Sequence, residues 1–352
     1  MIENIINDIE DDDQQLFEHW KVQVDEGQTP VRIDKYLAEK NPYQSRNRIQ
    51  NAADAGFIQV NGTPVKSNYK VRPNDVITLM LDYPKHDTSI VAENIPIDVV
   101  YEDDDLMVIN KAAGMVVHPG AGNFTGTLIN AIAYYLRDLE SFDANNPEVG
   151  LVHRIDKDTS GLLVVAKTPE AKSALGKQFF NKTTHRSYNA LVWGNIVEDE
   201  GRIEGNIGRD PKNRLRMKVF EPDSGIGKSA VTHYRVLERF GYTTLIECIL
   251  ETGRTHQIRA HMKHIGHPLF ADETYGGNEV LRGQRSSSYK AYIQNCFKIC
   301  PRQALHAKTL GFIHPRTGQQ LDFTSEWPAD FSALIEKWRN FISGTTLNTF
   351  VD

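Results

Sequence analysis

One acidic residue is the first candidate for chemistry in this chain. Asp156 follows the basic pair His153-Arg154 within a short polar segment, residues 153–161. The next residues, 162–166, are all apolar, which predicts a buried strand. Functional side chains commonly gather in loops at the mouths of such strands. Because an aspartate is ionised at neutral pH, Asp156 could act there as a nucleophile or as a proton acceptor.

Two other interpretations of this segment have to be weighed. Its spacing fits positions 1, 3, 5 and 6 of a calcium-binding loop that would start at Asp156. The twelfth position of such a loop needs a glutamate and here it is Lys167, which excludes an ordinary EF-hand. A purely structural role stays open at this point, because a lone aspartate in a polar loop often caps a turn.

Two more side chains with suitable chemistry lie downstream. Tyr188 falls within residues 187–194, whose composition predicts a strand. Arg259 falls within a predicted helix that follows a strand at residues 244–250 and ends at Gly266, a residue suited to a left-handed helix end. Alone, the tyrosine would be assigned to the core and the arginine to a solvated helix face. Their occurrence together with the aspartate favours an active site.

These segments resemble the RluA family of RNA pseudouridine synthases. The family's catalytic motif is typically His-Arg-Leu-Asp followed by Thr-Ser-Gly-Leu, which residues 153–162 match except for Ile155 in place of Leu. Residues 108–120 resemble the family's first motif, with Ala112 where Pro is usual. Residues 304–307 resemble its last motif. The resemblance extends over nearly all of residues 20–345.

The resemblance implies an isomerase that works without a metal or an organic cofactor. It would break the N1–C1′ bond of a uridine flipped out of its stack, turn the uracil and rejoin it through C5. Asp156 would be the nucleophile or proton acceptor, Tyr188 would stack on the uracil and help remove the C5 proton, and Arg259 would pair with the aspartate. Arg154 would fill the vacancy left by the base and hold phosphate. The expected substrate pocket contains His153, Ile155 and Leu305.

The length of 352 residues and an apolar content of 40% predict more than one folded domain. The expected fold class is α+β, with a mixed, largely antiparallel catalytic sheet preceded by a small alpha-L RNA-binding domain like that of ribosomal protein S-four. The expected parts are an acidic N-terminal extension at 1–19, the alpha-L domain at 20–85, a linker at 86–91, the catalytic domain at 92–345 and a tail at 346–352.

The net charge of −6 is unusual for an RNA-binding protein, but its distribution explains it. Residues 1–19 hold seven acidic residues and no Lys or Arg, and without them 40 basic residues face 39 acidic ones. Residues 32–81 hold eight basic and four acidic residues, an excess that a phosphate backbone attracts. Residues 205–218 carry five positive charges and are expected to form a loop that clamps RNA. The RNA-binding candidates are Arg154, Arg32, Arg46, Arg48, Lys66, Arg209, Lys212 and Arg214.

The resemblance implies large-subunit ribosomal RNA as the substrate, in the stem-loop at the subunit interface called helix 69. A tRNA or another ribosomal site is an alternative. A second class of function is a catalytically inactive, ribosome-associated RNA-binding factor on the same scaffold, which the intact Asp156, Tyr188 and Arg259 argue against. A third is a glycosidase acting on nucleosides, which is disfavoured because only one suitably placed acid is evident rather than two.

Metal binding and secretion are both disfavoured by the sequence. Four histidines cluster near the predicted helix, but no His-Glu-x-x-His motif occurs and Arg259 and Lys263 interleave them, so no metal is expected. Three cysteines, no signal peptide and no apolar run of membrane-spanning length predict a cytoplasmic protein that binds RNA, with no membrane partner.

Overall fold

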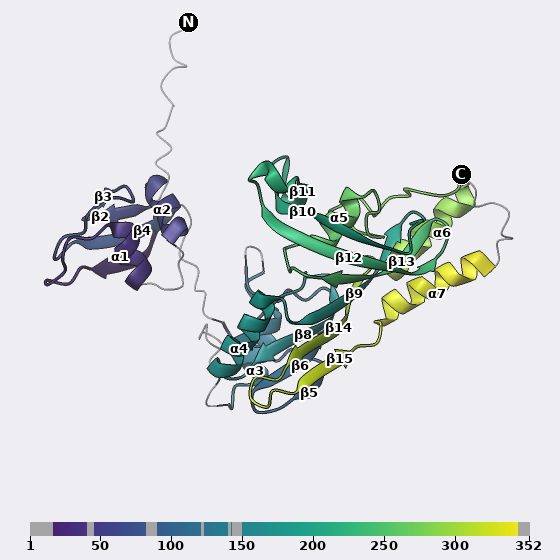
Figure 1. Cartoon of the computed structure of the whole chain (residues 1–352), viewed down its shortest axis with the longest axis horizontal. Helices are drawn as coiled ribbons and strands as arrows, with labels where there is room; N and C mark the ends of the chain where they lie inside the picture. The colour runs from purple at the N-terminus through teal and green to yellow at the C-terminus, as the bar shows by residue number, and fades with distance from the viewer. Residues whose placement is uncertain are drawn as a thin grey trace, which may run out of the picture. The chain divides into compact units, whose positions relative to one another are not determined.

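The computed structural model describes residues 17–40, 46–81, 90–120, 123–139, 142 and 150–343. The chain forms two compact units, residues 1–88 and 89–352 (Figure 1). The expected tail, most of the acidic extension and residues 86–89 of the expected linker lie outside the described residues. Within the described part, no helix is long and apolar enough to cross a membrane.

The first unit combines a four-stranded sheet with two helices. Its elements are β1 (Phe17–Gln23), α1 (Ile33–Lys40), α2 (Arg46–Asp54), β2 (Ile58–Val60), β3 (Thr63–Pro64) and β4 (Val76–Leu81). The strands lie in the order β1-β4-β2-β3, and the pairs are antiparallel. Ile33, Tyr36 and Leu37 are buried on one face of α1 in a cluster with residues of β2 and β4. Because β1 begins at Phe17, this unit starts before residue 20, the start expected from the sequence.

The turn between β2 and β3 follows directly from its two residues. Asn61 and Gly62 have φ values of 51° and 81°, the left-handed values that a two-residue type I′ hairpin turn requires. Asn61 Oδ1 also accepts a hydrogen bond of 2.8 Å from the backbone N–H of Val76, which ties the turn to β4. An Asn-Gly pair between two short apolar runs is a strong sequence signal for such a hairpin, and β2 and β3 pair antiparallel around it.

The second unit is built on one sheet of eleven strands. Its elements are β5 (Val99–Glu102), β6 (Leu106–Lys111), α3 (Leu128–Tyr135), β7 (Gly150–Leu151), β8 (Ser160–Ala166), α4 (Pro169–Asn181), β9 (His185–Trp193), β10 (Glu200–Asp210), β11 (Asn213–Phe220), β12 (Lys228–Arg239), β13 (Thr243–Leu250), α5 (Gln257–His264), α6 (Ser287–Ile299), β14 (Leu305–Ile313), β15 (Gln320–Thr324) and α7 (Ala329–Ser343). The main strand order is β11-β10-β12-β13-β9-β14-β8-β6-β5, with β7 beside β8 and β15 beside β14. Since β8 and β14 run parallel and the other pairs antiparallel, the sheet is mixed and the α+β fold class is confirmed.

Strand β8 shows how the sheet separates its two faces. All its residues are buried, as the apolar run predicts. Leu163 and Val165 face a cluster that includes residues of α3 and α5, whereas Leu162 and Val164 face a second cluster with α4. Side chains alternate between the faces of a strand, so one apolar run serves both layers. A third cluster joins β9 and β13 to α6 and α7 (Figure 1).

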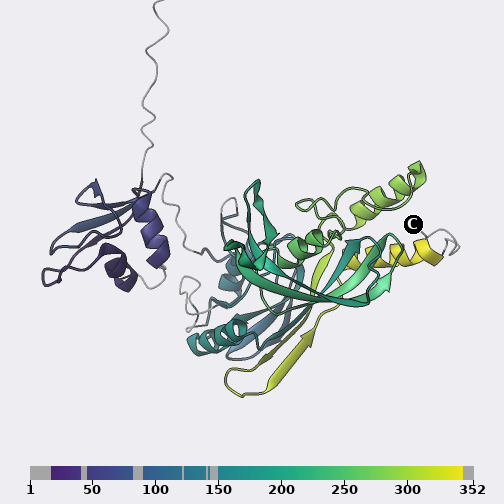
Figure 2. The same cartoon turned by 45° about the horizontal axis from the view of Figure 1, so that its top comes forward.

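The expected loop at residues 205–218 is wrong. These residues belong to β10 and β11, which pair antiparallel as a hairpin that projects beyond the rest of the sheet in the teal-green part of Figure 2. Arg216 and Lys218 alternate with Met217 and Val219, which pack in a small cluster with Tyr275. The alternation of charged and apolar residues is a strand signal that the count of charges concealed.

Gly161 is required where β8 meets β14. Its φ is 113°, and a Cβ built on it would lie 2.2 Å from the backbone oxygen of Ala307. This glycine of the Thr-Ser-Gly motif therefore allows the two parallel strands to approach closely. The glycine at the end of the polar segment 153–161 is thus required by backbone packing.

We predict that Gly161→Ala lowers the free energy of unfolding of the second unit by about 2 kcal/mol or more, since the added methyl group meets backbone and the φ is unfavourable. Chemical denaturation followed by circular dichroism measures this change. Gly176→Ala in α4 is the control, because a Cβ there meets nothing within 4 Å. Equal stability of the two variants would contradict the prediction.

Candidate active site

Asp156 lies between β7 and β8, at the wall of a cavity. The cavity has a volume of about 350 Å³ and is lined by residues of the 152–159 segment, α4, β9, the 253–259 segment and Leu305. The side chain of Asp156 is 17% exposed, so its carboxylate reaches the cavity while most of its surface is covered. A volume of this size lies within the range of small-molecule sites, roughly 300–1,000 Å³.

Arg259 on α5 holds the carboxylate of Asp156. Its Nη1 donates a hydrogen bond of 3.1 Å to Asp156 Oδ2. The same guanidinium donates two further bonds to Asp272, from Nε at 2.7 Å and from Nη2 at 2.9 Å. Asp272 is completely buried, and it was not anticipated from the sequence because it stands in a loop without a recognised motif. A fork-shaped pair of this kind fixes the plane of the guanidinium.

Asp272 and Asp156 keep the guanidinium of Arg259 positively charged. Burial opposes the charge, but the hydrogen bonds and the negative charge of Asp272, together with Asp156, raise the pKa of Arg259 above its usual value. The guanidinium also lies over the ring of Tyr275, with its carbon 5.0 Å from the ring centroid. Asp156 therefore has a permanent cation beside it, in a fixed orientation.

Tyr188 lies on β9 and also lines the cavity. It is 7% exposed, and its ring belongs to the same buried cluster as Ile155 and Leu305. Burial raises the pKa of the Tyr188 phenol, although the neighbouring Arg186 opposes that shift. At neutral pH the cavity therefore presents an aromatic ring with an uncharged hydroxyl group.

His256 is a further side chain near the carboxylate, and its position beside Asp156 was not expected from the sequence. Its Nε2 lies 3.9 Å from Asp156 Oδ2, and its Nδ1 lies 3.3 Å from the hydroxyl oxygen of Tyr275. Burial lowers the pKa of His256 despite the attraction of Asp156, while Arg259 acts in the same direction as burial. Its backbone has a φ of 54°, a strained value for a residue other than glycine.

Two buried basic side chains fix the loop that follows Asp156. Lys111 Nζ donates hydrogen bonds to the backbone oxygens of Ala112, Met115 and Lys157, at 2.7 to 2.9 Å. Burial lowers the pKa of Lys111 to about 7. Arg302 Nη1 donates to the backbone oxygen of Asp158 at 2.9 Å. Because two successive carbonyls after the aspartate are held, the position of Asp156 is determined by contacts distant in sequence.

The three expected pocket residues all line the cavity. Ile155 and Leu305 are buried and supply apolar surface. His153 Nε2 accepts a hydrogen bond of 3.0 Å from the backbone N–H of Val164, and its ring stacks on Phe179 with centroids 4.4 Å apart. Burial lowers the pKa of His153 to about 3, so this histidine is a neutral part of the wall.

The arginines expected to bind RNA fall into different environments. Arg154 is exposed and lines the cavity. In the first unit, Arg32 and Arg46 both form ion pairs with the buried Asp34, at 3.0 and 3.1 Å, while about half of each side chain remains exposed. Burial opposes ionisation of Asp34, but its bonds to Arg32, Gln50 and Arg46 lower its pKa to about 2. These two arginines therefore hold the module together as well as offering charge.

The remaining candidates lie on two hairpins and one helix. Lys66 is exposed just after β3, and Lys212 is exposed in the turn between β10 and β11. Arg209 is exposed on β10, and its charge contributes to the lowered pKa of His256, after burial and Arg259. The side chains of Arg48 and Arg214 lie outside the described residues. Tyr275 connects the hairpin to the site, because its hydroxyl accepts from the Met217 N–H at 2.9 Å.

One group of side chains among the described residues has the composition of a metal site. The hydrogen bonds within this group explain its arrangement without a metal ion. Asp103, Asp105 and His314 lie together away from the cavity. His314 Nδ1 accepts the backbone N–H groups of Arg316 and Thr317, so Nε2 carries the proton and donates to Asp103 at 2.9 Å. Both ring nitrogens are therefore already engaged in hydrogen bonds within the protein.

Comparisons with known proteins agree with this arrangement. Residues 105–264 match the family described as RNA pseudouridylate synthase, and residues 31–77 match the S4 domain. An uncharacterized RNA pseudouridine synthase of Chlorobaculum parvum is 45% identical, over 90% of this chain and 97% of that protein. Ribosomal large subunit pseudouridine synthase D of Nitrosomonas europaea is 43% identical, over 88% of this chain and 85% of that protein. The fold is shared with human RNA pseudouridylate synthase domain containing 1, at a TM-score of 0.51 and 23% identity, over 72% of this chain and 97% of that chain.

The chain therefore belongs to the RNA pseudouridine synthases, in the RluA-type group in which an S4 domain precedes the catalytic domain. It is an enzyme that isomerises uridine in RNA to pseudouridine. The family resemblance stated from the sequence is thereby confirmed, and the alpha-L domain is an S4 domain.

We predict that Asp272→Asn slows pseudouridine formation by roughly 10- to 100-fold, because the guanidinium of Arg259 loses its charged fork and its aim at Asp156. The free energy of unfolding should also fall, by about 3 kcal/mol, as expected when a buried ion pair loses one charge. Glu273→Gln, an adjacent exposed carboxylate, is the control. A variant at Asp272 with the rate of the wild type would show that Arg259 needs no second partner.

Proposed function

We propose that this enzyme isomerises a uridine in large-subunit ribosomal RNA, in the helix 69 region, with Asp156 as its catalytic carboxylate. The observation that carries this proposal is a chain of hydrogen bonds from Asp272 through Arg259 to Asp156. It ends at a carboxylate that lines the same cavity as Tyr188. The RNA target is supported by relatives of 41–43% identity whose names specify the large ribosomal subunit.

The reaction needs a fixed carboxylate and room for a turning base. Asp156 would either attack C1′ or accept the C2′ proton, and in both routes the N1–C1′ bond breaks and the uracil leaves as an anion. After the base turns, a C5–C1′ bond forms, the carboxylate is released or returns its proton, C5 loses its hydrogen and N1 gains one. Nothing is consumed, so the reaction needs no cofactor.

The other cavity residues have matching tasks in this proposal. The uridine must leave its stack, at a cost of a few kcal/mol that protein contacts offset. Arg154, exposed at the cavity, would occupy the vacated position and contact phosphate. Tyr188 would stack on the uracil, and because its phenol is uncharged it would remove the C5 proton by relaying its own proton onward. His256 also lines the cavity beside Asp156, and burial keeps its imidazole neutral and able to accept a proton by lowering its pKa.

The substrate is tested by mapping and by hydrogen release. Pseudouridines are mapped in the RNA of a strain that lacks the gene, and loss in helix 69 is the expected result. Purified enzyme is then given large-subunit RNA that carries tritium at uracil C5, since isomerisation must expel that hydrogen. Loss of a pseudouridine in tRNA instead would overturn the ribosomal target, and release of free uracil would indicate a glycosidase.

We predict that Asp156→Asn abolishes tritium release while RNA affinity stays within about twofold of the wild type, because shape is preserved and only the charge is removed. Binding is measured by fluorescence anisotropy with labelled stem-loop RNA. Asp158→Asn is the matched control in the same loop, since its side chain does not line the cavity. Tritium release above background from the Asp156 variant would remove this residue from the reaction.

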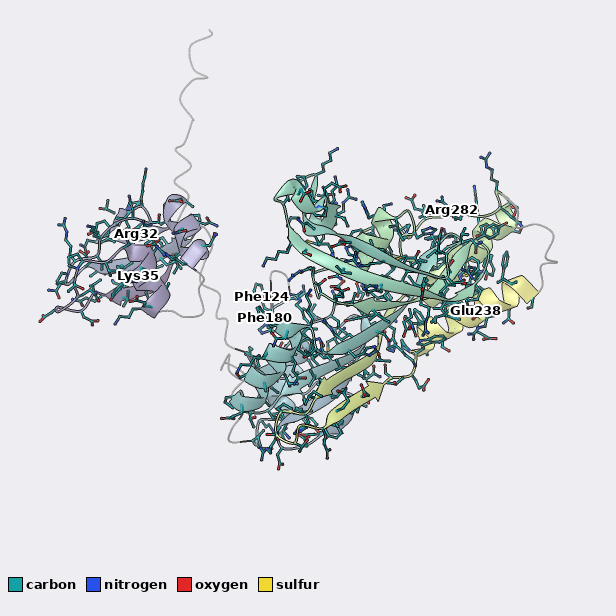
Figure 3. The ribbon with its side chains drawn as sticks, in the orientation of Figure 1. Arg32, Lys35, Phe124, Phe180, Glu238 and Arg282 are labelled. Atoms are coloured by element: carbon teal, nitrogen blue, oxygen red, sulfur yellow. The ribbon has the colours of Figure 1, made fainter. Side chains whose placement is uncertain are left out.

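The S4 domain should contribute affinity through charge. Arg32 and Arg46 are poor probes, because their removal would leave Asp34 buried without its cations. Lys35 and Lys66 are exposed, and Lys35 is labelled in Figure 3. We predict that Lys35→Gln with Lys66→Gln weakens RNA binding and reduces the slope of log affinity against log salt by about 0.7 to 0.9 for each phosphate that the domain no longer neutralises.

The control for this salt titration is Lys290→Gln, an exposed lysine on α6 of the other unit. It should leave the slope unchanged. An unchanged slope in the double variant as well would mean that Lys35 and Lys66 contact no phosphate, and that the affinity of the S4 domain for RNA has another source.

A further inference from the structure

Three arginines are buried among the described residues, and one of them differs from the other two. Arg259 donates two bonds to Asp272, and Arg302 donates two bonds to Asp330, at 2.7 and 3.0 Å. Arg186 is 7% exposed, yet its Nε has no hydrogen-bond partner in the described part of the chain. Buried charges in proteins are normally paired, because an unpaired one is strongly unfavourable.

Arg186 points into the catalytic cavity. It lies on β9, two positions before Tyr188, and both side chains line the cavity wall. Its positive charge opposes the rise in the pKa of the Tyr188 phenol and adds to the lowering of the pKa of His153, and all three side chains line the cavity. The cavity thus contains a second fixed cation, in addition to the one that holds Asp156.

The guanidinium of Arg186 stacks on an aromatic ring, and a glycine on another side leaves room for it. Its carbon lies 5.2 Å from the ring centroid of Phe179, which in turn stacks on His153. On another side, a Cβ built on Gly253 would lie 3.0 Å from Arg186 Nη1, so a larger residue there would crowd it. Stacking occupies the face of a guanidinium and leaves the N–H groups at its edge available.

We propose that Arg186 binds a phosphate of the substrate RNA next to the flipped uridine. This inference rests on the proposed function, because it assumes that the uridine enters this cavity. The backbone of the RNA enters with its base and supplies the missing anion, which a planar guanidinium binds through two parallel N–H bonds. The exposed Arg154 and Arg254 at the same cavity can follow a moving backbone, whereas Arg186 is fixed and recognises one position.

The geometry explains why this phosphate would be selected. Phe180, at the end of α4 and labelled in Figure 3, is 86% exposed and marks the rim of the cavity next to Phe179. A phosphate that reaches Arg186 has passed this rim, so only the backbone of an extruded nucleotide arrives there. Binding energy gained at Arg186 is therefore available after base flipping and not in a stacked helix.

Arg186 could instead serve only to adjust the pKa of Tyr188, and this role would give a different experimental result. Its charge beside Tyr188 opposes the rise in the pKa of the phenol that burial causes. A residue that served only this purpose would alter the pH profile of kcat and leave the affinity for RNA unchanged. The test therefore measures affinity, KM and kcat separately.

The experiment combines protein and backbone substitutions. The full-length enzyme, Arg186→Met and Arg186→Lys are compared on a synthetic stem-loop centred on the modified uridine. Each RNA carries either normal phosphates or one uncharged methylphosphonate, placed 5′ or 3′ of that uridine. We expect Arg186→Met to bind the normal RNA roughly 10- to 100-fold more weakly, as for loss of a charged hydrogen bond, with Arg186→Lys between the two.

The decisive result is non-additivity at one phosphate. For the wild type, one of the two methylphosphonates should weaken binding as much as Arg186→Met does, and for Arg186→Met that same RNA should bind no more weakly than normal RNA. Additive losses at both positions would overturn the proposal, as would unchanged affinity with a shifted pH profile of kcat. Melting temperatures within a few degrees of the wild type show that the variants fold, and Arg186→Lys keeps the charge if Arg186→Met does not fold.

A separate measurement distinguishes failure of the proposed function from failure of the proposed phosphate contact. Tritium release by the wild-type enzyme on the unmodified stem-loop tests the reaction and its target without reference to Arg186. If release occurs and binding is additive, only the phosphate contact is wrong. If release does not occur, the target is wrong, and the inference about Arg186 falls with it.

Discussion

The position of Asp156 depends on one buried ion pair. Asp272 and Arg259 form a two-bond fork in the protein interior, and the remaining nitrogen of the guanidinium reaches Asp156. A buried pair of this kind contributes little to stability beyond what apolar residues would give, but it holds its members in one geometry. Here the geometry joins α5 to the loop after β7. The carboxylate of Asp156 is therefore positioned from a helix about a hundred residues further along the chain.

The loop that carries Asp156 is held from three directions. Lys111 binds the carbonyl after it, Arg302 binds the next one, and the close approach of β14 at Gly161 fixes the start of β8. A carboxylate held in this way keeps its orientation when substrate binds, so little reorganisation accompanies the reaction. The hydrogen bonds from Lys111 and Arg302 and the packing of β8 on β14 therefore fix the orientation of Asp156.

The positions of the charged residues in this protein say more about its function than the net charge does. The chain is acidic overall, yet arginines gather at the cavity and on the β10–β11 hairpin. Several cations that look equivalent in the sequence differ in structure. Arg32 and Arg46 share a buried aspartate, whereas the Nε of Arg186 has no acceptor among the residues that the structure describes. The first two stabilise a fold, and the last is suited to a ligand that brings its own negative charge.

The sequence alone determined the family, the α+β class, the strand that holds Tyr188, the helix that holds Arg259 and the Asn61-Gly62 turn. These follow from local signals: motifs, alternation, helical spacing and turn residues. Tertiary structure decided which cations are paired. Asp272 and Arg186 stand in no recognised motif, and their importance arises from how neighbours distant in the chain surround them. The loop predicted at residues 205–218 is instead part of the β10–β11 hairpin, because alternation of charged and apolar residues there outweighs the number of charges. Local patterns specify elements, whereas burial and pairing exist only after the chain has folded.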